Sequence, residues 1–245
     1  MKAIKKLQEL LNTTTLIDMT WTLEEGMPYW PTQTPFTAET KEHQSLGCES
    51  YWRNIAFCEH TGTHMDAGCH FVPGQPSIDR TPVEQIMGRG VNIDVTDTPP
   101  CGYAPLSKVL EFEEKYGRIQ EGDIVFFRFG WDEKWAIGPE GKDYLTDWPG
   151  IHPDIGKYLL TRKVKAVGCD TLALDAFGST NPNHPILLGN GVNILENVNK
   201  LGELPPFFGV IGLPCKFKDG SGATIRLVAL IDQEEDGKEV KEIGA

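Results

Sequence analysis

The spacing of apolar and β-branched residues predicts a series of strands along the whole chain. Such residues fit a pleated, half-buried surface and favour extended structure. The expected strands cover residues 16–20, 53–58, 91–95, 123–129, 165–169, 209–213 and 223–231. Residues 124–127 form an unbroken apolar run, which is typical of a strand that is covered on both faces.

Helical periodicity predicts three longer helices, at residues 4–11, 106–116 and 153–161. The second follows Pro105 and the third begins at Pro153, and proline suits a first helical turn. A short capped helix is also expected at 81–85. The glycine-rich segment 218–222 predicts a hairpin turn between the last two strands.

The order of these elements predicts a mixed sheet. Strands and helices alternate, but several strands follow one another without a helix between them. This favours a mixed α/β, or α+β-like, fold over a doubly wound one. We find no internal repeat and no linker, so we expect a single domain over residues 1–245.

Composition narrows the classes of partner. The chain has 23 Lys and Arg against 35 Asp and Glu, which gives a formal net charge of −12. Such acidity disfavours nucleic acid and anionic membranes as partners. There is neither a signal-peptide pattern nor an apolar run that could span a bilayer. The six cysteines are scattered, so we expect reduced thiols in a cytoplasmic protein.

The side chains that could bind a metal are most concentrated between residues 60 and 70. His60, His64, Asp66 and His70 fall within this segment, although the chain has only six histidines. Imidazole and carboxylate suit Zn²⁺ or Mn²⁺, and three protein ligands leave positions open for water. A lone pair of histidines four apart often arises by chance, but the added Asp66 and His70 favour a metal site. We expect a strand over 51–58, then a tight loop that carries these residues.

This segment resembles the signature His-x-Gly-Thr-His-x-Asp-x-Pro-x-His-Phe of the cyclase family of metal-dependent hydrolases. That family includes bacterial kynurenine formamidases and isatin hydrolases. Gly68 stands where the family has proline, so we expect a more flexible loop. Further resembling segments are 16–20, 26–31, 167–175 and 184–197. The resemblance implies a swivelling β/β/α fold with a barrel-like mixed sheet.

The resemblance also implies a set of metal ligands, which are His60, His64, Asp66, His184 and Glu196. The first three would hold one ion, and Asp66 would bridge to a second ion that the last two also hold. The number of ions, one or two, stays open. Their identity, Zn²⁺ or Mn²⁺, stays open as well, because the same donors suit both metals.

Two residues have implied catalytic roles. His70 is the proton carrier, because imidazole titrates near neutral pH, and Glu196 serves as a base if only one ion binds. From the residues alone, we expect His184 to be a surface residue in a loop and Glu196 to be a charged residue on the exposed face of a helix. Asp170 and Asp175 either orient ligands or simply end a strand. His43 and His152 read as surface residues.

The implied activity is hydrolysis of an amide C–N bond by metal-activated water. The substrate class is a small aryl formamide or cyclic amide, similar to N-formylkynurenine or isatin. A metal-dependent cyclase or lyase acting on a small carbonyl compound is the alternative. Trp30 and Phe71 are the candidate substrate-binding residues. The resemblance implies a homodimer or homotetramer, in which the loop of Trp30 reaches toward a neighbouring subunit.

Overall fold

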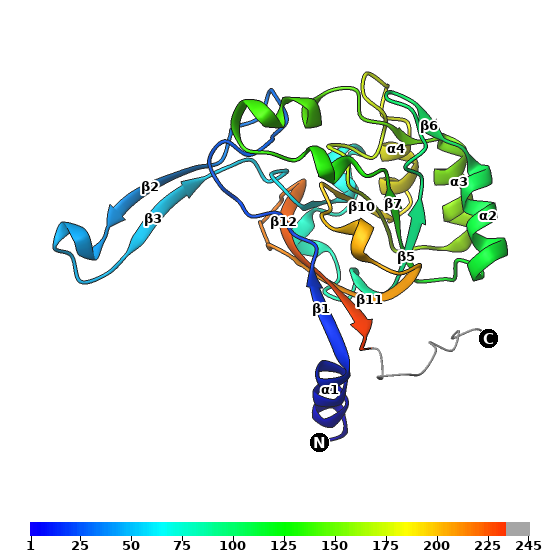
Figure 1. Ribbon diagram of the computed structural model, residues 1–245, viewed down its shortest axis with the longest axis horizontal. Coiled ribbons are helices and arrows are strands. Elements are labelled where there is room, and N and C mark those ends of the chain that lie inside the picture. Colours follow the sequence, from blue (N-terminus) through cyan, green and yellow to red (C-terminus); the bar gives the residue numbers. More distant parts are fainter. Residues whose placement is uncertain (234–245) are drawn as a thin grey trace.

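The computed structural model describes residues 1–233, and its centre is a mixed sheet that closes into a barrel (Figure 1). The strands follow the order β12, β11, β5, β7, β9, β10 and β4, and β4 pairs back onto β12. The barrel strands are β4 (His64–Asp66), β5 (Met87–Asp94), β7 (Ile124–Arg128), β9 (Ala166–Cys169), β10 (Asn193–Glu196), β11 (Phe207–Pro214) and β12 (Gly222–Asp232). A further strand, β1 (Thr14–Asp18), pairs with the outer end of β12.

Strand directions confirm the mixed sheet. β5, β7, β9 and β10 run parallel to one another, whereas β4, β11 and β12 pair antiparallel with their neighbours. A separate two-stranded parallel pair joins β6 (Tyr103–Ala104) to β8 (Gly150–Ile151). Short 3₁₀ helices lie in the connections, at Gln44–Leu46, Gly68–His70, Ile78–Arg80, Trp131–Lys134, Gly138–Leu145 and Leu201–Glu203.

Two apolar clusters lie on opposite faces of the parallel strands. One packs Val125 and Phe127 against α2 (Leu106–Tyr116), α3 (Pro153–Arg162) and α4 (Asn183–Leu188), which cover the outside of the barrel. The other cluster contains Ile124 and Phe126 and fills the barrel. The apolar run in β7 is therefore buried on both faces, as the sequence predicted.

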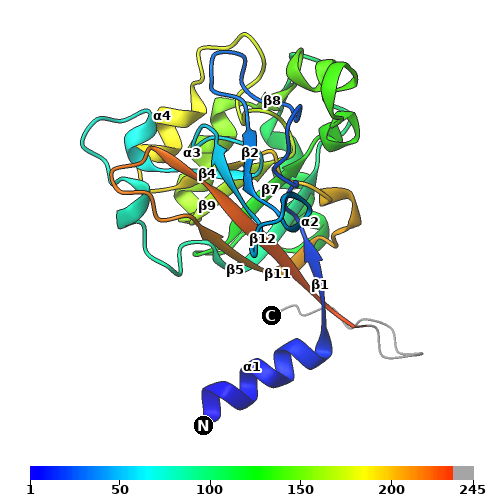
Figure 2. The same cartoon turned by 90° about the vertical axis from the view of Figure 1, so that its left-hand side faces the viewer.

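Two segments project away from the barrel. The strands β2 (Thr37–Glu42) and β3 (Trp52–Ala56) form an antiparallel hairpin, which we call the arm (Figure 1). Every residue of β3 is exposed, and the rings of Phe36 and Phe57 stack at the base of the arm, 6.0 Å apart. The helix α1 (Lys2–Thr13) extends from β1 and buries none of its residues against the described chain (Figure 2).

Most predicted elements appear with their ends shifted by a few residues. The helix at 106–116 and the turn at 218–222 are confirmed. The expected helix at 81–85 is wrong. This segment forms consecutive turns, in which the backbone N–H of Gln85 donates to Pro82. A helix has no room to continue there, because β5 begins at Met87.

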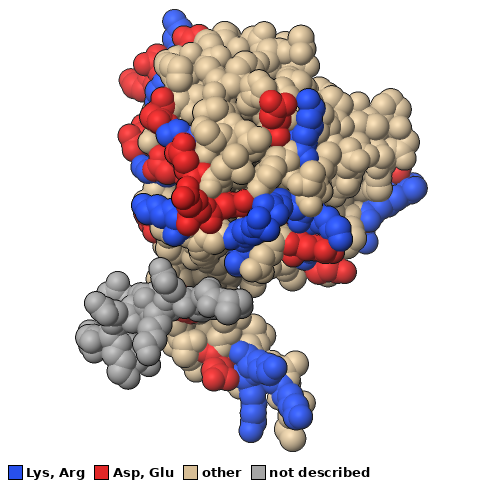
Figure 3. Space-filling model, turned by 90° about the vertical axis from the view of Figure 1, so that its right-hand side faces the viewer, with Lys and Arg blue, Asp and Glu red and all other residues tan. Residues whose placement is uncertain are grey.

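Acidic and basic side chains are interspersed on the face that carries α2 and α3 (Figure 3). Ion pairs link some of them, including Arg162 with Glu113 at 2.9 Å and Lys163 with Glu121 at 2.9 Å. Within residues 1–233, no helix combines the length and the hydrophobicity needed to cross a bilayer.

Candidate metal centre

The strand β4 supplies two of the predicted ligands. His64 and Asp66 are two residues apart, so their side chains lie on the same face of the strand. Both were expected in a loop, and the structure corrects this: β4 is hydrogen-bonded to β10 on one edge and to β12 on the other. Hydrogen bonds along both edges hold the backbone of β4 in the sheet, and this sets the direction of both side chains.

Pairing with β10 brings in a third predicted ligand. Glu196 lies directly opposite His64, and cross-strand partners share a face of the sheet. Met65, which lies between His64 and Asp66, belongs to the cluster inside the barrel. The three ligand side chains therefore project from the outer wall of the barrel, on the side that α4 covers.

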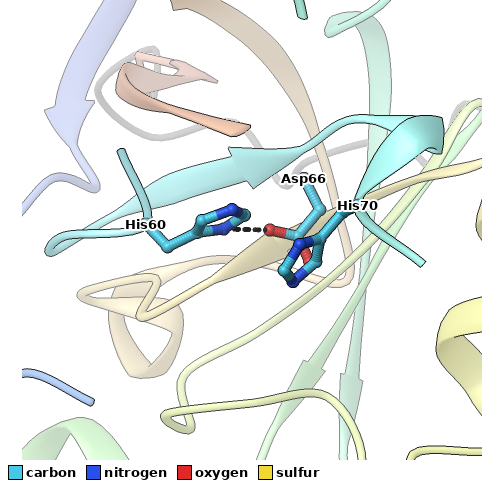
Figure 4. A group of neighbouring side chains, drawn as sticks. All are labelled: His60, Asp66 and His70. Carbon is cyan, nitrogen blue, oxygen red and sulfur yellow. Dashed lines mark hydrogen bonds and ion pairs between the residues drawn. The ribbon is translucent and has the colours of Figure 1, made fainter. Parts of the chain in front are cut away.

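His184 and His60 complete the group from outside the sheet. His184 lies in α4 and is only 3% exposed, so it is not the surface loop residue that its neighbours suggested. Glu196 is 5% exposed and lies in a strand, so the helix-surface reading is wrong as well. His60 precedes a turn at Gly62, whose φ of +62° favours glycine. Figure 4 shows the ring of His60 facing the carboxylate of Asp66.

Each of these three imidazoles has one nitrogen next to a fixed acceptor outside the cluster. His64 Nδ1 lies 2.8 Å from the carbonyl oxygen of Gly62, and His184 Nδ1 lies 2.6 Å from Oδ2 of Asp175. His60 Nε2 lies 2.9 Å from Oγ of Ser221. Because a neutral imidazole carries one N–H, donation to these acceptors leaves the other nitrogen with a free lone pair.

The three remaining nitrogens converge on two carboxylates. His60 Nδ1 is 2.8 Å from Asp66 Oδ1, and His64 Nε2 is 3.4 Å from the same oxygen. His64 Nε2 is also 3.4 Å from Glu196 Oε2. His184 Nε2 is 3.3 Å from Glu196 Oε1 and 3.7 Å from Asp66 Oδ2. The two oxygens of Asp66 thus face different histidines.

This arrangement fits a divalent cation. Asp66 is fully buried, and its Oδ2 has no hydrogen-bond partner among the described residues. A buried carboxylate is costly unless positive charge lies beside it. Imidazole nitrogens and carboxylate oxygens are the donors that Zn²⁺ and Mn²⁺ accept, and partners on the far nitrogen usually orient a ligating histidine.

The electrostatics of the cluster favour positive charge. Burial by itself lowers the pKa of His64, but hydrogen bonds and charges from Asp66 and Glu196 raise it to about 10. For His184, burial is likewise outweighed by Asp175 and Glu196, and the pKa rises to about 10. Burial favours protonation of Asp66, yet His60 and His64 hold its pKa well below the usual range.

His70 and Phe71 lie at the rim of this group. His70 ends the 3₁₀ helix Gly68–His70, and its ring centre is 4.1 Å from that of His60. Burial lowers the pKa of His70, so its imidazole is neutral at pH 7. The ring of Phe71 lies 4.4 Å from that of His184. His70 and Phe71 are both exposed and border the buried ligands.

Other residues singled out in the sequence have structural roles. Asp175 holds His184, whereas Asp170 accepts backbone N–H bonds from Phe129, Gly130 and Trp131 and shapes that loop. His43 lies at the tip of the arm, where it bonds Ser45, and His152 caps α3. Both histidines lie outside the cluster.

Gly68 has a packing role. An added Cβ would lie 2.7 Å from Cβ of Gln75, so this position has little room for a larger residue. The expectation of a looser segment is not supported by the 3₁₀ helix that begins there.

Sequence reasoning missed several residues that hold the ligands. Asn197 has a positive φ of 54°, and its amide donates to the carbonyl of Gly62, beside His64. Ser221 stood out only as part of a turn, and Glu59 not at all, yet both lie beside His60. No motif marks these residues, because their contacts depend on strand register.

An aromatic cavity lies between the loop of Trp30 and the segment that follows Asp175. Its volume is about 380 Å³, and its lining includes Trp30, Trp148 and Phe177. Trp30 packs edge-on against Trp148 of its own chain, with ring centres 5.8 Å apart. The indole N–H of Trp148 donates to the carbonyl of Asp175, whose carboxylate holds His184. Trp148 therefore connects the lining of the cavity to the residue that holds His184.

A family model named Cyclase and described as "Putative cyclase" matches residues 17–176. The chain belongs to this family. Its fold, and the resemblance noted in the sequence, are thereby confirmed.

Individual relatives agree with the Cyclase family assignment. An isatin hydrolase of Roseibium aggregatum is 27% identical over 208 residues, which cover 78% of each chain. A kynurenine formamidase of Erythrobacter litoralis is 26% identical and covers 86% of this chain and 91% of its own. The solved structure of isatin hydrolase A from Labrenzia aggregata, bound to benzyl benzoate, superposes with a TM-score of 0.83. It is 27% identical and covers 94% of this chain and 100% of its own.

Proposed function

We propose that this chain is a metal-dependent amidohydrolase that cleaves the C–N bond of a small aryl formamide or cyclic amide. One observation carries the proposal: nitrogens of His60, His64 and His184 converge on two buried carboxylates, those of Asp66 and Glu196, and Oδ2 of Asp66 has no hydrogen-bond partner among the described residues. The relatives named above are an isatin hydrolase and a kynurenine formamidase, which suggests a compound similar to isatin or N-formylkynurenine.

The proposed cofactor is Zn²⁺ or Mn²⁺, with two ions that share Asp66. Asp66 lies in one donor group with His64 and Glu196. Its Oδ1 faces His60 and His64, while Oδ2 faces His184, which supports a bridging role. When bound, a divalent ion polarises the amide carbonyl and lowers the pKa of water toward neutrality.

The protein's own side chains would carry the proton and hold the substrate. His70 is neutral at pH 7 and partly open to solvent, so it can accept a proton and deliver it to the departing nitrogen. Glu196 is fixed by the backbone N–H of Leu174, 2.9 Å from Oε1, which suits a ligand or a base of defined orientation.

The aromatic cavity supports a planar substrate. Trp30, Trp148 and Phe177 offer ring faces and edges around a volume of about 380 Å³. Phe71 lies beside His184 on the same side of the cluster as His70.

The decisive experiment removes and restores the metal. Chelation should abolish hydrolysis of a panel of arylformamides and cyclic amides, and added Zn²⁺ or Mn²⁺ should restore it. Reaction in ¹⁸O-labelled water should place one labelled oxygen in the acid product. Full activity without metal would refute the proposal, and an unlabelled product would favour the cyclase or lyase alternative.

We also propose a cytoplasmic homodimer or homotetramer that acts on small molecules and not on nucleic acid. All six cysteines are free thiols in the described chain, which suits a reducing compartment. The arm and α1 leave apolar side chains exposed, including Trp52 at 47% and Ile55 at 55%. An isolated two-stranded hairpin is marginally stable in water, so a second subunit is the natural covering for the arm.

A further inference from the structure

A chain of hydrogen bonds leads from His60 toward the protein surface. The backbone N–H of Ser221 donates to Oε1 of Glu59 at 2.9 Å, and the Ser221 hydroxyl donates to the same oxygen. Oγ of Ser221 is in turn 2.9 Å from Nε2 of His60. The side chain of Glu59 is 30% exposed, whereas that of His60 is only 7% exposed.

The direction of these bonds follows from the number of protons. A carboxylate only accepts, and a serine hydroxyl has a single proton. Ser221 gives that proton to Glu59, so its oxygen must accept from the Nε2–H of His60. This assigns a proton to Nε2 of His60 and leaves Nδ1, which lies 2.8 Å from Oδ1 of Asp66, as the nitrogen that faces the candidate metal position.

The same bonds exclude a different role for Ser221. Ser221, His60 and Asp66 have the spacing of a nucleophilic triad, in which histidine takes the serine proton. Here the serine proton points to Glu59 and not to His60. Ser221 is therefore placed to hold the imidazole rather than to attack a substrate.

The turn that carries Ser221 is itself anchored. The backbone N–H of Asp219 donates to Oδ1 of Asp79 at 3.1 Å, and Ser77 donates to the same oxygen. The adjoining Gly222 lets the ring of His60 lie against the backbone, since an added Cβ would lie 2.5 Å from its Cε1. His60 is thus held by the β11–β12 turn, far away in sequence.

We propose that Glu59 and Ser221 are positioning residues that set the tautomer and orientation of His60 and so control its binding of metal. The inference rests on the proposed function, because it assumes that His60 is a ligand. His64 is oriented by a buried backbone carbonyl and His184 by a buried carboxylate. The hydrogen bonds that orient His60 lead instead to Glu59, whose side chain is partly exposed. Glu59 acts only through Ser221.

The test measures Zn²⁺ affinity by competition with a chromophoric chelator, independently of turnover. Ser221→Ala and Glu59→Ala should each weaken Zn²⁺ binding by about 10–100-fold, the usual effect of losing a partner that orients a ligand. The double variant should bind as weakly as Ser221→Ala alone, because the two residues act in series. Ser221→Thr, which keeps the hydroxyl, should retain most of the affinity.

Ser45→Ala is the matched control, since it removes a serine hydroxyl that bonds a histidine at the tip of the arm. Its Zn²⁺ affinity should equal that of the wild type. Glu59→Ala changes a partly exposed side chain, so it keeps the test valid if Ser221→Ala fails to fold. Unchanged affinity in Glu59→Ala, or additive losses in the double variant, would overturn the inference. A wild-type protein that binds no Zn²⁺ or Mn²⁺ would instead overturn the proposed function.

Discussion

The imidazole of His184 is locked by Asp175, whose Oδ2 lies 2.6 Å from Nδ1. The same carboxylate accepts from the backbone N–H of Asn183 and of His184, at the start of α4. One side chain therefore both orients a candidate ligand and caps the helix that carries it.

Asp175→Asn should weaken metal binding by about 10–100-fold. Asparagine presents an amide N–H where a carboxylate oxygen stood, so either His184 or the α4 backbone loses its acceptor. Metal affinity by chelator competition measures the effect. Asp154→Asn, at the exposed start of α3, is the control and should bind metal like the wild type. Equal affinities in both variants would contradict the role of Asp175.

Gly222→Ala should displace His60 from Asp66. The new Cβ would lie 2.5 Å from Cε1 of His60, and such overpacking typically costs about 1–3 kcal/mol. We expect the variant to bind metal more weakly than the wild type. The thermal unfolding midpoint of the metal-free protein should fall only modestly. Affinity equal to that of the wild type would mean that His60 either tolerates the shift or is not a ligand.

Metal binding should release protons. The pKa values of His64 and His184 are raised to about 10 without metal, because Asp66, Asp175 and Glu196 outweigh the effect of burial. A metal ion must displace those protons at pH 7, so affinity should rise with pH. Calorimetric titrations at one pH in two buffers of different ionisation enthalpy should give different enthalpies. Identical enthalpies would show that no proton leaves.

The stability of the metal-free protein should have the opposite pH dependence. For both histidines the folded pKa of about 10 lies above the reference value of 6.5. Their stabilising contribution is therefore complete below pH 6.5 and is lost as the pH rises toward 10. Denaturant unfolding in the presence of chelator, at pH 6.5 and pH 9, should show this loss. Added metal should reduce the difference.

His70→Ala should lower kcat by about 10²–10⁴-fold, the typical contribution of a proton-transfer group. The metal content should stay the same, because the ring of His70 lies beside the ligand His60 and reaches the buried group only from its rim. Steady-state kinetics and elemental analysis of one preparation separate the two effects. His152→Ala, at the exposed cap of α3, is the control. Wild-type turnover in His70→Ala would remove it from the mechanism.

Replacing residues 37–56 by a short Gly-Ser linker should lower the oligomeric mass. The flanking rings of Phe36 and Phe57 already stack 6.0 Å apart, so a short linker can close the gap without strain. Light scattering after size exclusion gives the mass of both proteins. An unchanged mass, or a monomeric wild type, would contradict the proposal that a second subunit covers the arm.

The sequence revealed much of this fold because local patterns determined the elements that carry it. The apolar run at 124–127 and the amphipathic pattern at 106–116 correspond closely to β7 and α2. The strands β4 and β10 were harder to see. Each is very short and contains polar side chains directed at the ligand cluster, so neither shows an apolar alternation.

The ligands were easier to predict than the residues that hold them. His60, His64 and Asp66 stand close together in the sequence, and that density is itself a signal. His184 was accessible only through resemblance, because a proline follows it and no local pattern predicts a helix there. Ser221 lies 161 residues from His60, and only the antiparallel pairing of β4 with β12 brings the two together.

The double pairing of β4 has a consequence for how the enzyme matures. Its three residues join β10 and β12, and Asp66 pairs with both Ile194 and Gly222. A nascent chain that has not yet delivered β12 cannot close the ring, and contacts across so many residues form late and slowly. Metal capture should therefore wait until β12 has left the ribosome, and a chain truncated before residue 222 should retain little affinity for the ion.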